Sequence, residues 1–198
     1  MTAASAPHSN EPWQLQPASA RARLWLFLPC VALPMVVSLA LAVPLVMKGA
    51  PMLSAPFRAW GIQTLGVLAF TVVLWVLLDR LIHRHRLQVD AGGIEVTTTF
   101  YRRRLAWPEL QLDSAKVIAI QEHTEHAPML RTNGVSIIGF NSGWFRSRTM
   151  EKLFVATAGG ERLAWLPTTL GYSLLLQPRK PQALLDRLRE LAPSPPRR

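Results

Sequence analysis

The chain of 198 residues contains a single cysteine, Cys30, which excludes an intramolecular disulfide, a thiolate metal cluster and a redox-active cysteine pair. Catalytic signatures are also missing. The sequence has no glycine-rich phosphate loop, no G-x-S-x-G turn and no pair of carboxylates placed for acid–base catalysis. We therefore expect a protein that is not an enzyme, with no catalytic residue, no cofactor and no metal.

Acidic residues are scarce as well. The chain has 12 Asp and Glu against 22 Lys and Arg, which gives a formal net charge of +10. A chain this basic favours an acidic partner, either nucleic acid or the anionic lipids of a membrane. Because zinc-finger spacing, a helix-turn-helix signature and an aromatic RNA-binding motif are all lacking, we expect membrane lipids and no nucleic acid.

Charged residues are absent from two apolar stretches, residues 24–47 and 61–78. Each approaches the about 20 residues that a helix needs to cross a hydrocarbon core of about 30 Å. Both stretches are apolar around the whole helix, which disfavours a core helix of a soluble protein, and the first is too long for a signal-peptide core. We expect two transmembrane helices, the first of them bent at Pro29, Pro34 and Pro44.

Positive charges concentrate on the outer flanks of these stretches. Five arginines lie there: Arg21, Arg23, Arg80, Arg84 and Arg86. The loop between the stretches carries only Lys48 and Arg58. By the positive-inside rule, this asymmetry predicts a multi-pass protein with both termini in the cytoplasm.

The composition predicts four regions. We expect a disordered leader over residues 1–20, a transmembrane hairpin over 21–86, one folded domain over 87–192 and a disordered, proline-rich tail over 193–198. The domain of about 100 residues is long enough to bury a single core. It follows directly on the second hydrophobic stretch.

Alternation of apolar and polar residues predicts that this domain is mainly β. A hairpin is expected at residues 87–100, with the turn at 91–93, and further strands at 103–107, 117–120, 152–157, 161–166 and 172–176. A helix beginning at Pro181 would place Leu184, Leu185, Leu188 and Leu191 on one face. These elements predict a barrel or bent sandwich of about seven strands, closed at one end by the C-terminal helix.

Several short motifs follow one another along the predicted domain in an order that is typical of one protein family. They include Asp90-Ala91-Gly92-Gly93-Ile94, Trp107-Pro108-Glu109-Leu110, Arg131-Thr132-Asn133-Gly134, Gly143-Trp144-Phe145 and Gly171-Tyr172-Ser173. In this order the chain resembles the bacterial pleckstrin-homology-like membrane proteins over about residues 60 to 191. The resemblance implies a seven-stranded barrel with a C-terminal helix, location in the bacterial inner membrane and no enzymatic activity.

One departure from the pleckstrin-homology pattern bears on ligand choice. Domains of this kind that bind phosphoinositides usually carry cations in the first hairpin loop. The corresponding loop here, Asp90-Ala91-Gly92-Gly93, is acidic and has no cation. The resemblance therefore does not imply a phosphoinositide site.

Basic residues near aromatic ones form the candidate lipid or partner surface. In a strand, Arg102 and Arg104 would share one face and Arg103 the other. Together with a second basic and aromatic group, the candidate residues are Arg102, Arg104, Trp144, Arg146, Arg148 and Lys152. The alternative reading is that the arginines are solvated and the aromatic residues pack in the core.

The segment from Gln121 to His126 holds two histidines and two glutamates. Its H-x-x-H spacing is not that of the H-E-x-x-H zinc motif, and the other histidines that could complete a site lie in the leader and beside the second hydrophobic stretch. We expect a polar loop there, without a metal.

Taken together, these patterns predict a non-enzymatic, membrane-tethered binding or scaffold module that presents its domain to a protein partner. A strand edge of the barrel could take up a peptide. Two alternatives stay open: a sensor of anionic lipid surfaces, and an accessory subunit of a larger membrane assembly. The sequence also leaves open a homo-oligomer.

Overall fold

The computed structural model describes residues 12–49, 51–52 and 54–193. The chain divides into two compact units, residues 20–81 and the remainder. The first unit is helical, and the second is mainly β with a C-terminal helix.

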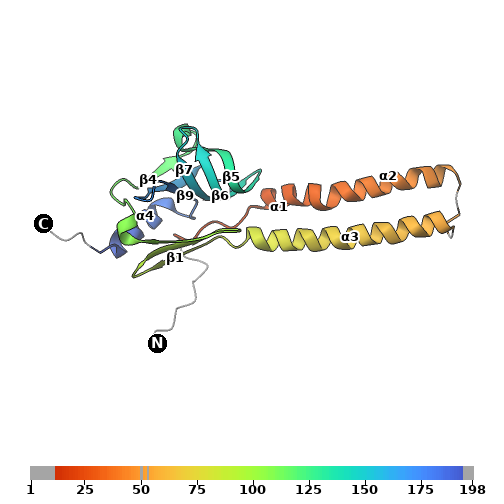
Figure 1. Ribbon diagram of the computed structural model, residues 1–198, viewed down its shortest axis with the longest axis horizontal. Helices are drawn as coiled ribbons and strands as arrows, with labels where there is room; N and C mark the ends of the chain where they lie inside the picture. Colours follow the sequence, from red (N-terminus) through yellow and green to blue (C-terminus); the bar gives the residue numbers. More distant parts are fainter. Residues whose placement is uncertain (1–11, 50, 53, 194–198) are drawn as a thin grey trace, which may run out of the picture. The chain divides into compact units, whose positions relative to one another are not determined.

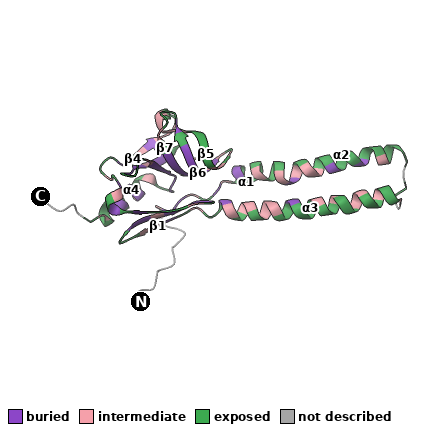
Figure 2. Ribbon diagram, in the orientation of Figure 1, coloured by how far each residue is buried: buried purple, intermediate pink, exposed green. Residues whose placement is uncertain are grey.

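The helical unit is a hairpin. A continuous helical run comprises α1 (Ala20–Phe27), a π-helical turn (Leu28–Ala32) and α2 (Leu33–Met47), and α3 (Ala55–Ile82) lies beside it (Figure 1). The two runs are long and apolar enough to cross a membrane. Figure 2 shows that most of their residues are exposed or half-buried, which for apolar side chains such as Ile62 and Phe70 is typical of a lipid-facing surface.

A proline-containing irregularity interrupts the first run. The π-helical turn contains Pro29, whose ring removes one backbone donor, and Pro44 sits inside the regular part of α2. The irregularity at Pro29 agrees with the expected disturbance of this helix.

Polar contacts join the two runs at two levels. Ser38 Oγ lies 2.6 Å from Thr64 Oγ1, and Trp60 Nε1 donates to the Ser38 carbonyl oxygen over 2.8 Å. Near the other end, Arg23 Nε donates to Asp79 Oδ1 over 2.7 Å. This pairing gives Asp79, which has little weight in the positive-inside rule, a role in holding the hairpin together.

The β unit contains two sheets, in which nearly all strand pairs are antiparallel. Strands β1 (Arg86–Asp90), β2 (Gly93–Thr97) and β3 (Arg102–Ala106) form a three-stranded sheet in that order. A six-stranded sheet has the order β4-β8-β9-β7-β6-β5, with β4 (Lys116–Ala119), β5 (Pro128–Ile137), β6 (Phe140–Ser147), β7 (Lys152–Thr157), β8 (Arg162–Pro167) and β9 (Ser173–Leu176). Among the strand pairs of the described residues, β7–β9 alone is parallel.

This architecture corrects part of the expected fold. A barrel of about seven strands was predicted, whereas the described residues form nine strands in two sheets that do not close into a barrel. The predicted strands at 152–157, 161–166 and 172–176 correspond to β7, β8 and β9 within one residue at each boundary. The hairpin of β5 and β6 was missed because glycine and polar residues hide its alternation.

The first hairpin needs glycine at its turn. Gly93 has φ of +146°, and a Cβ atom there would lie 1.9 Å from the Leu105 carbonyl oxygen of the neighbouring strand. The close approach of β3 to β2 therefore excludes any side chain at this position.

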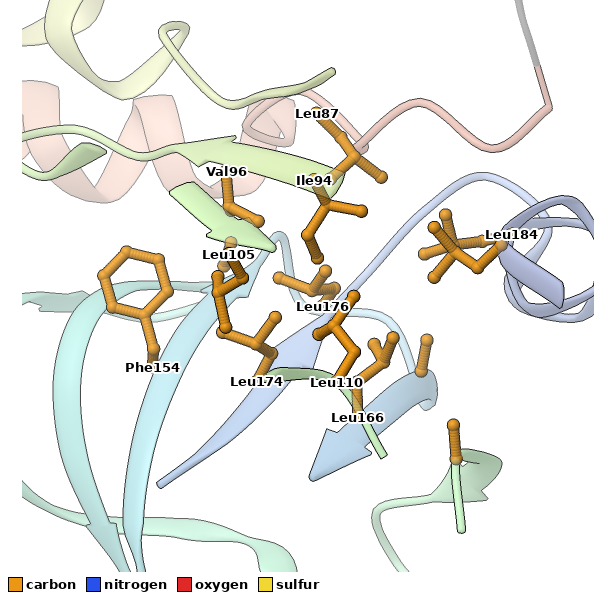
Figure 3. Close-up of a cluster of buried hydrophobic side chains, with 14 of the residues drawn as sticks. Leu87, Ile94, Val96, Leu105, Leu110, Phe154, Leu166, Leu174, Leu176 and Leu184 are labelled. Carbon is orange, nitrogen blue, oxygen red and sulfur yellow. The ribbon is translucent and has the colours of Figure 1, made fainter. Parts of the chain in front are cut away.

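The main core lies between the two sheets. Figure 3 shows Leu87, Ile94, Val96 and Leu105 of the three-stranded sheet pointing toward side chains of the six-stranded sheet, among them Phe154, Leu174 and Leu176. The opposite face of the larger sheet buries a second, smaller cluster that includes Phe145, Leu153 and Leu175. Strand β9 is buried at all four positions because both of its faces are covered.

The C-terminal helix α4 (Pro181–Leu191) completes the main core. Leu184, Leu185 and Leu188 are buried, as the sequence predicts, whereas Leu191 remains 38% exposed. The amphipathic face thus covers one end of the core rather than plugging a barrel.

Residues 12–18, which we call the N-terminal strap, also belong to the β unit. The Gln16 amide donates to the Gln177 carbonyl oxygen over 2.9 Å, the Arg179 amide donates to the Gln14 carbonyl oxygen over 3.0 Å, and Leu15 is buried in the main core. The prediction of a disordered leader is therefore wrong for these residues. Local composition could not show this because the ordering comes from pairing with residues more than 150 positions away. Residues 1–11 of the predicted leader and residues 194–198 of the predicted tail lie outside the described part of the chain.

Candidate anion-binding cavity

The consecutive arginines of β3 alternate between the two faces of the strand, as predicted. Arg102 donates to both carboxylate oxygens of Glu95, over 2.5 and 2.8 Å, and Arg104 Nη2 donates to Asp90 over 3.0 Å. Arg103 points to the other side, where its guanidinium carbon lies 5.1 Å from the centre of the Trp144 ring. Arg102 and Arg104 are therefore separated from the predicted aromatic group by the strand itself.

Trp144 forms the centre of a cation–aromatic cluster. Lys152 Nζ lies 4.5 Å from the Trp144 ring centre, and Tyr172 and Phe154 make edge-on ring contacts with the same ring. Burial raises the pKa of Tyr172. Trp144 itself is only 8% exposed, so the aromatic rings pack in the core while the two cations remain exposed, as in the alternative reading of these residues.

Arg146 and Arg148 stay on the surface near the end of β6. Arg146 Nη1 donates to the Met150 carbonyl oxygen over 2.9 Å, and Arg148 is exposed in the turn that follows. Thus the six predicted residues do not form one site. Arg102 and Arg104 lie on the polar face of the small sheet, and Trp144, Arg146, Arg148 and Lys152 lie on or beside strands β6 and β7.

A different set of cations surrounds a cavity of about 600 Å³ in the β unit. The lining residues are Gln14, Leu15, Pro17, His83, Arg84, His85, Arg86, Gln88, Glu95, Thr97, Arg102 and Arg179. Four are arginines and only one, Glu95, is acidic. Of the predicted site residues, the cavity includes Arg102 alone.

The small sheet supplies one wall of this cavity through its polar face. Thr97 pairs with Arg86 on one neighbouring strand and with Arg102 on the other, and Gln88 pairs with Glu95 two residues further along. Residues opposite each other on adjacent strands point to the same side, so these five side chains share one face. The apolar residues between them face the core.

The N-terminal strap and the segment after β9 supply further lining residues. Gln14 Nε2 donates to the Leu87 carbonyl oxygen over 2.9 Å, and the strap is tied by backbone hydrogen bonds to residues 177–180. This pairing brings Arg179 to the same cavity as Arg84 and Arg86. The sequence contained no local signal for this, because the lining comes from segments far apart along the chain.

His85 is the buried ionisable group of the cavity. Its ring stacks on Phe140 with centroids 4.7 Å apart, and neither ring nitrogen has a hydrogen-bond partner. Burial, with a smaller contribution from the charge of His83, lowers the pKa of His85 to about 4. His85 is therefore neutral at pH 7, and the arginines provide the positive charge of the cavity.

The neutral state of His85 makes the stability of the β unit sensitive to acid. Because the unfolded chain has the higher histidine pKa, it takes up the proton first, so stability is present above about pH 6.5 and declines as the pH falls toward 4. We expect His85 to account for a loss of about 2 kcal/mol between pH 7 and 5. In His85→Phe, which retains a ring against Phe140, this part of the pH dependence should disappear. Urea unfolding at both pH values measures it, and equal pH dependence in both proteins would contradict the assignment.

Arginine is suited to an anionic ligand with several oxygens. Its planar guanidinium presents up to five donors and binds phosphate or carboxylate through two parallel hydrogen bonds. A cavity of this size falls in the range of about 300 to 1,000 Å³ that is usual for small-ligand sites. The arrangement supports binding of an anion.

The histidine segment has a structural arrangement of its own. His126 stacks on Trp165 with centroids 4.5 Å apart, and its Nδ1 lies 3.5 Å from Glu151. His123 Nδ1 lies 3.2 Å from Glu125. Among the described residues, no three His, Cys, Asp or Glu side chains are grouped so that they could hold a metal ion.

Comparisons of the chain with protein-family models, with curated proteins and with solved structures gave no match.

Proposed function

We propose that the chain is a non-enzymatic, membrane-tethered module whose β unit binds anionic lipid at the cytoplasmic face of the bacterial inner membrane. The observation that carries the proposal is the four-arginine cavity. Its lining includes residues immediately before the first hydrophobic run and immediately after the second.

Chain connectivity supports a location near the lipid headgroups. Arg84 follows the last residue of α3 by two positions, and Pro17 precedes the first residue of α1 by three. At no more than about 3.6 Å per residue, these lining residues lie within about 7 and 11 Å of the helix ends. If the two runs span the bilayer, the cavity is held close to the surface where each cation adds about 1 kcal/mol of attraction to anionic lipid.

The strand edges favour lipid over peptide addition. In the described part of the six-stranded sheet, edge strand β4 has only four residues, and edge strand β5 begins at Pro128 and is interrupted by two register shifts. In the small sheet, β3 carries three consecutive arginines and Gln14 occupies the Leu87 carbonyl oxygen on β1. Short, bulged, charged or covered edges resist strand addition. A protein partner would have to use another surface.

A pleckstrin-homology-like ancestry is part of this proposal. The two packed sheets and the C-terminal amphipathic helix are compatible with such a domain, and the order of motifs from Asp90 to Tyr172 supports it. The acidic turn at Asp90 still argues against ligand binding in the manner of phosphoinositide-specific domains. The cavity lies instead at the other end of the β1–β2 hairpin, beside Arg86 and Thr97.

Lipid-dependent stability of the full chain tests the proposal. In a neutral detergent we expect phosphatidylglycerol to raise the melting temperature of the protein and phosphatidylcholine to leave it unchanged, because only a ligand that prefers the folded state stabilises it. At about 0.5 M salt the shift should shrink, since exposed charges are then screened over a few ångströms. Equal shifts with both lipids would count against anionic-lipid binding.

The proposal also predicts the side of the membrane on which each part of the chain lies. In a Cys30→Ser background, cysteine at Met52, between the two helical runs, should react with a membrane-impermeant maleimide in intact cells. Cysteine at Gln182, exposed on α4, should react only after the membrane is permeabilised. The opposite pattern would reverse the cytoplasmic assignment of the β unit.

A further inference from the structure

We propose that the cavity is a stoichiometric site for one phosphate group, and that Glu95 competes with this group for Arg102. The inference rests on the proposed function but makes a narrower claim. General attraction of a basic surface to anionic lipid needs no defined site, whereas a phosphate site predicts that individual residues of the cavity act differently from equally charged residues elsewhere.

The register of the small sheet places two arginines on either side of Thr97. Arg86 and Arg102 flank Thr97 on the two neighbouring strands, so their Cα atoms are separated by two strand spacings, about 10 Å. Side chains as long as arginine can reach a common phosphate across that distance. Thr97 supplies a hydroxyl at the middle of the arrangement.

Two further arginines approach from other segments. Arg84 belongs to the connection after α3, and Arg179 belongs to the segment that pairs with the N-terminal strap. The four guanidinium groups carry four positive charges, and the single carboxylate of the cavity can neutralise only one of them. The remaining positive charge is complementary to a phosphodiester or a phosphate ion.

Glu95 acts as an internal competitor. Its carboxylate accepts two hydrogen bonds from Arg102, and its side chain is 13% exposed whereas that of Arg102 is 70% exposed. The Arg102 side chain is thus accessible to a ligand, although two of its N–H groups already donate to Glu95. A bound phosphate would share Arg102 with Glu95 and would also be repelled by that carboxylate. Replacing Glu95 by glutamine should therefore strengthen phosphate binding.

His85 provides a second, independent indication of a ligand. Its side chain lines the cavity, and both ring nitrogens are buried without a hydrogen-bond partner. Buried polar atoms are rarely left unpaired, so an unsatisfied ring N–H at a cavity wall points to a missing acceptor. Because both nitrogens are buried, a phosphate oxygen would supply that acceptor after a small movement of the His85 ring or of a neighbouring lining side chain.

The experiment uses the full chain in neutral detergent, titrated with short-chain dihexanoyl phosphatidylglycerol and, separately, with inorganic phosphate. We expect one ligand per chain, and about fivefold tighter binding by Glu95→Gln, from removal of one repulsive charge. Arg102→Gln should bind about fivefold more weakly. Glu122→Gln is the matched control, because Glu122 is exposed outside the cavity and its replacement changes the net charge by the same amount.

The two titrations separate the sources of the phosphate. A Glu95→Gln gain with both ligands, with competition between them, supports a site that recognises phosphate from either source. A gain with the lipid alone supports a headgroup site, and a gain with inorganic phosphate alone supports the cavity site while contradicting the lipid-binding function. If Glu95→Gln and Glu122→Gln bind the lipid equally and the parent protein also binds it, the lipid-binding function stands and the phosphate site is overturned.

Discussion

Leu188→Ala is expected to destabilise the β unit by about 2 to 5 kcal/mol, the range observed when a buried leucine is replaced and a cavity remains. Leu188 is fully buried in the main core, on the face of α4 that packs over the end of the two sheets. The loss combines the transfer free energy of the removed methyl groups with the cost of the void. Urea unfolding of the detergent-solubilised full chain, followed by near-ultraviolet circular dichroism, measures the effect.

Leu191→Ala is the matched control on the same helix. Leu191 is 38% exposed, so the same chemical change should cost less than about 1 kcal/mol. If both variants unfold at the same urea concentration as the parent chain, α4 does not contribute to the core.

The largest expected effect on binding comes from the cavity arginines. Replacing Arg84, Arg86, Arg102 and Arg179 by glutamine should weaken binding of dihexanoyl phosphatidylglycerol by about 4 kcal/mol, or about a thousandfold, if each cation contributes about 1 kcal/mol. The four side chains surround a single cavity, so their contributions act on the same ligand. Isothermal titration of the full chain at low salt gives the change.

A second fourfold variant keeps the change in net charge equal. Arg104, Arg131, Arg146 and Arg148 are exposed and lie outside the cavity lining. Their replacement by glutamine should leave binding within about a factor of ten of the parent, because exposed charges at a distance act weakly and are screened by salt. Equal weakening by both fourfold variants would mean that the protein responds to its total charge and not to the cavity.

Local patterns predicted the elements whose residues interact with near neighbours. The first hairpin follows from the alternation around Asp90-Ala91-Gly92-Gly93, and the buried face of α4 follows from the spacing of Leu184, Leu185 and Leu188. The opposite orientations of Arg102 and Arg103 follow from the period of a strand. In each case the determining interactions lie within a few residues.

Features assembled from distant segments could not be predicted in this way. The N-terminal strap resembles a disordered leader in composition, yet it is ordered by hydrogen bonds to residues 177–180. The cavity combines that strap, the connection after α3, the small sheet and Arg179, a residue that no motif distinguishes. In the sequence, Arg84 and Arg86 indicated only the membrane topology of the chain.

The proposed mechanism thus depends on arrangement more than on charge alone. Arginines are abundant on this protein, but Arg103 lies over the ring of Trp144, a core tryptophan, and Arg104 is paired with Asp90 on the surface. The cavity gathers four arginines around one carboxylate, in segments joined directly to the hydrophobic runs. We therefore place the proposed lipid contact at the cavity and not at the predicted aromatic group.

Site-specific photo-crosslinking in native membranes tests the central claim most directly. A photoreactive amino acid at Gln88, which lines the cavity, should crosslink anionic phospholipid in excess of its share of the membrane lipid, and the same probe at Gln182 on the surface of α4 should not. Mass spectrometry of the crosslinked peptides identifies the lipid class. The account predicts enrichment of anionic lipid at Gln88 that is lost in the Arg84, Arg86, Arg102 and Arg179 variant. Crosslinking at Gln88 to no lipid, or to lipids only in proportion to their abundance, would contradict it.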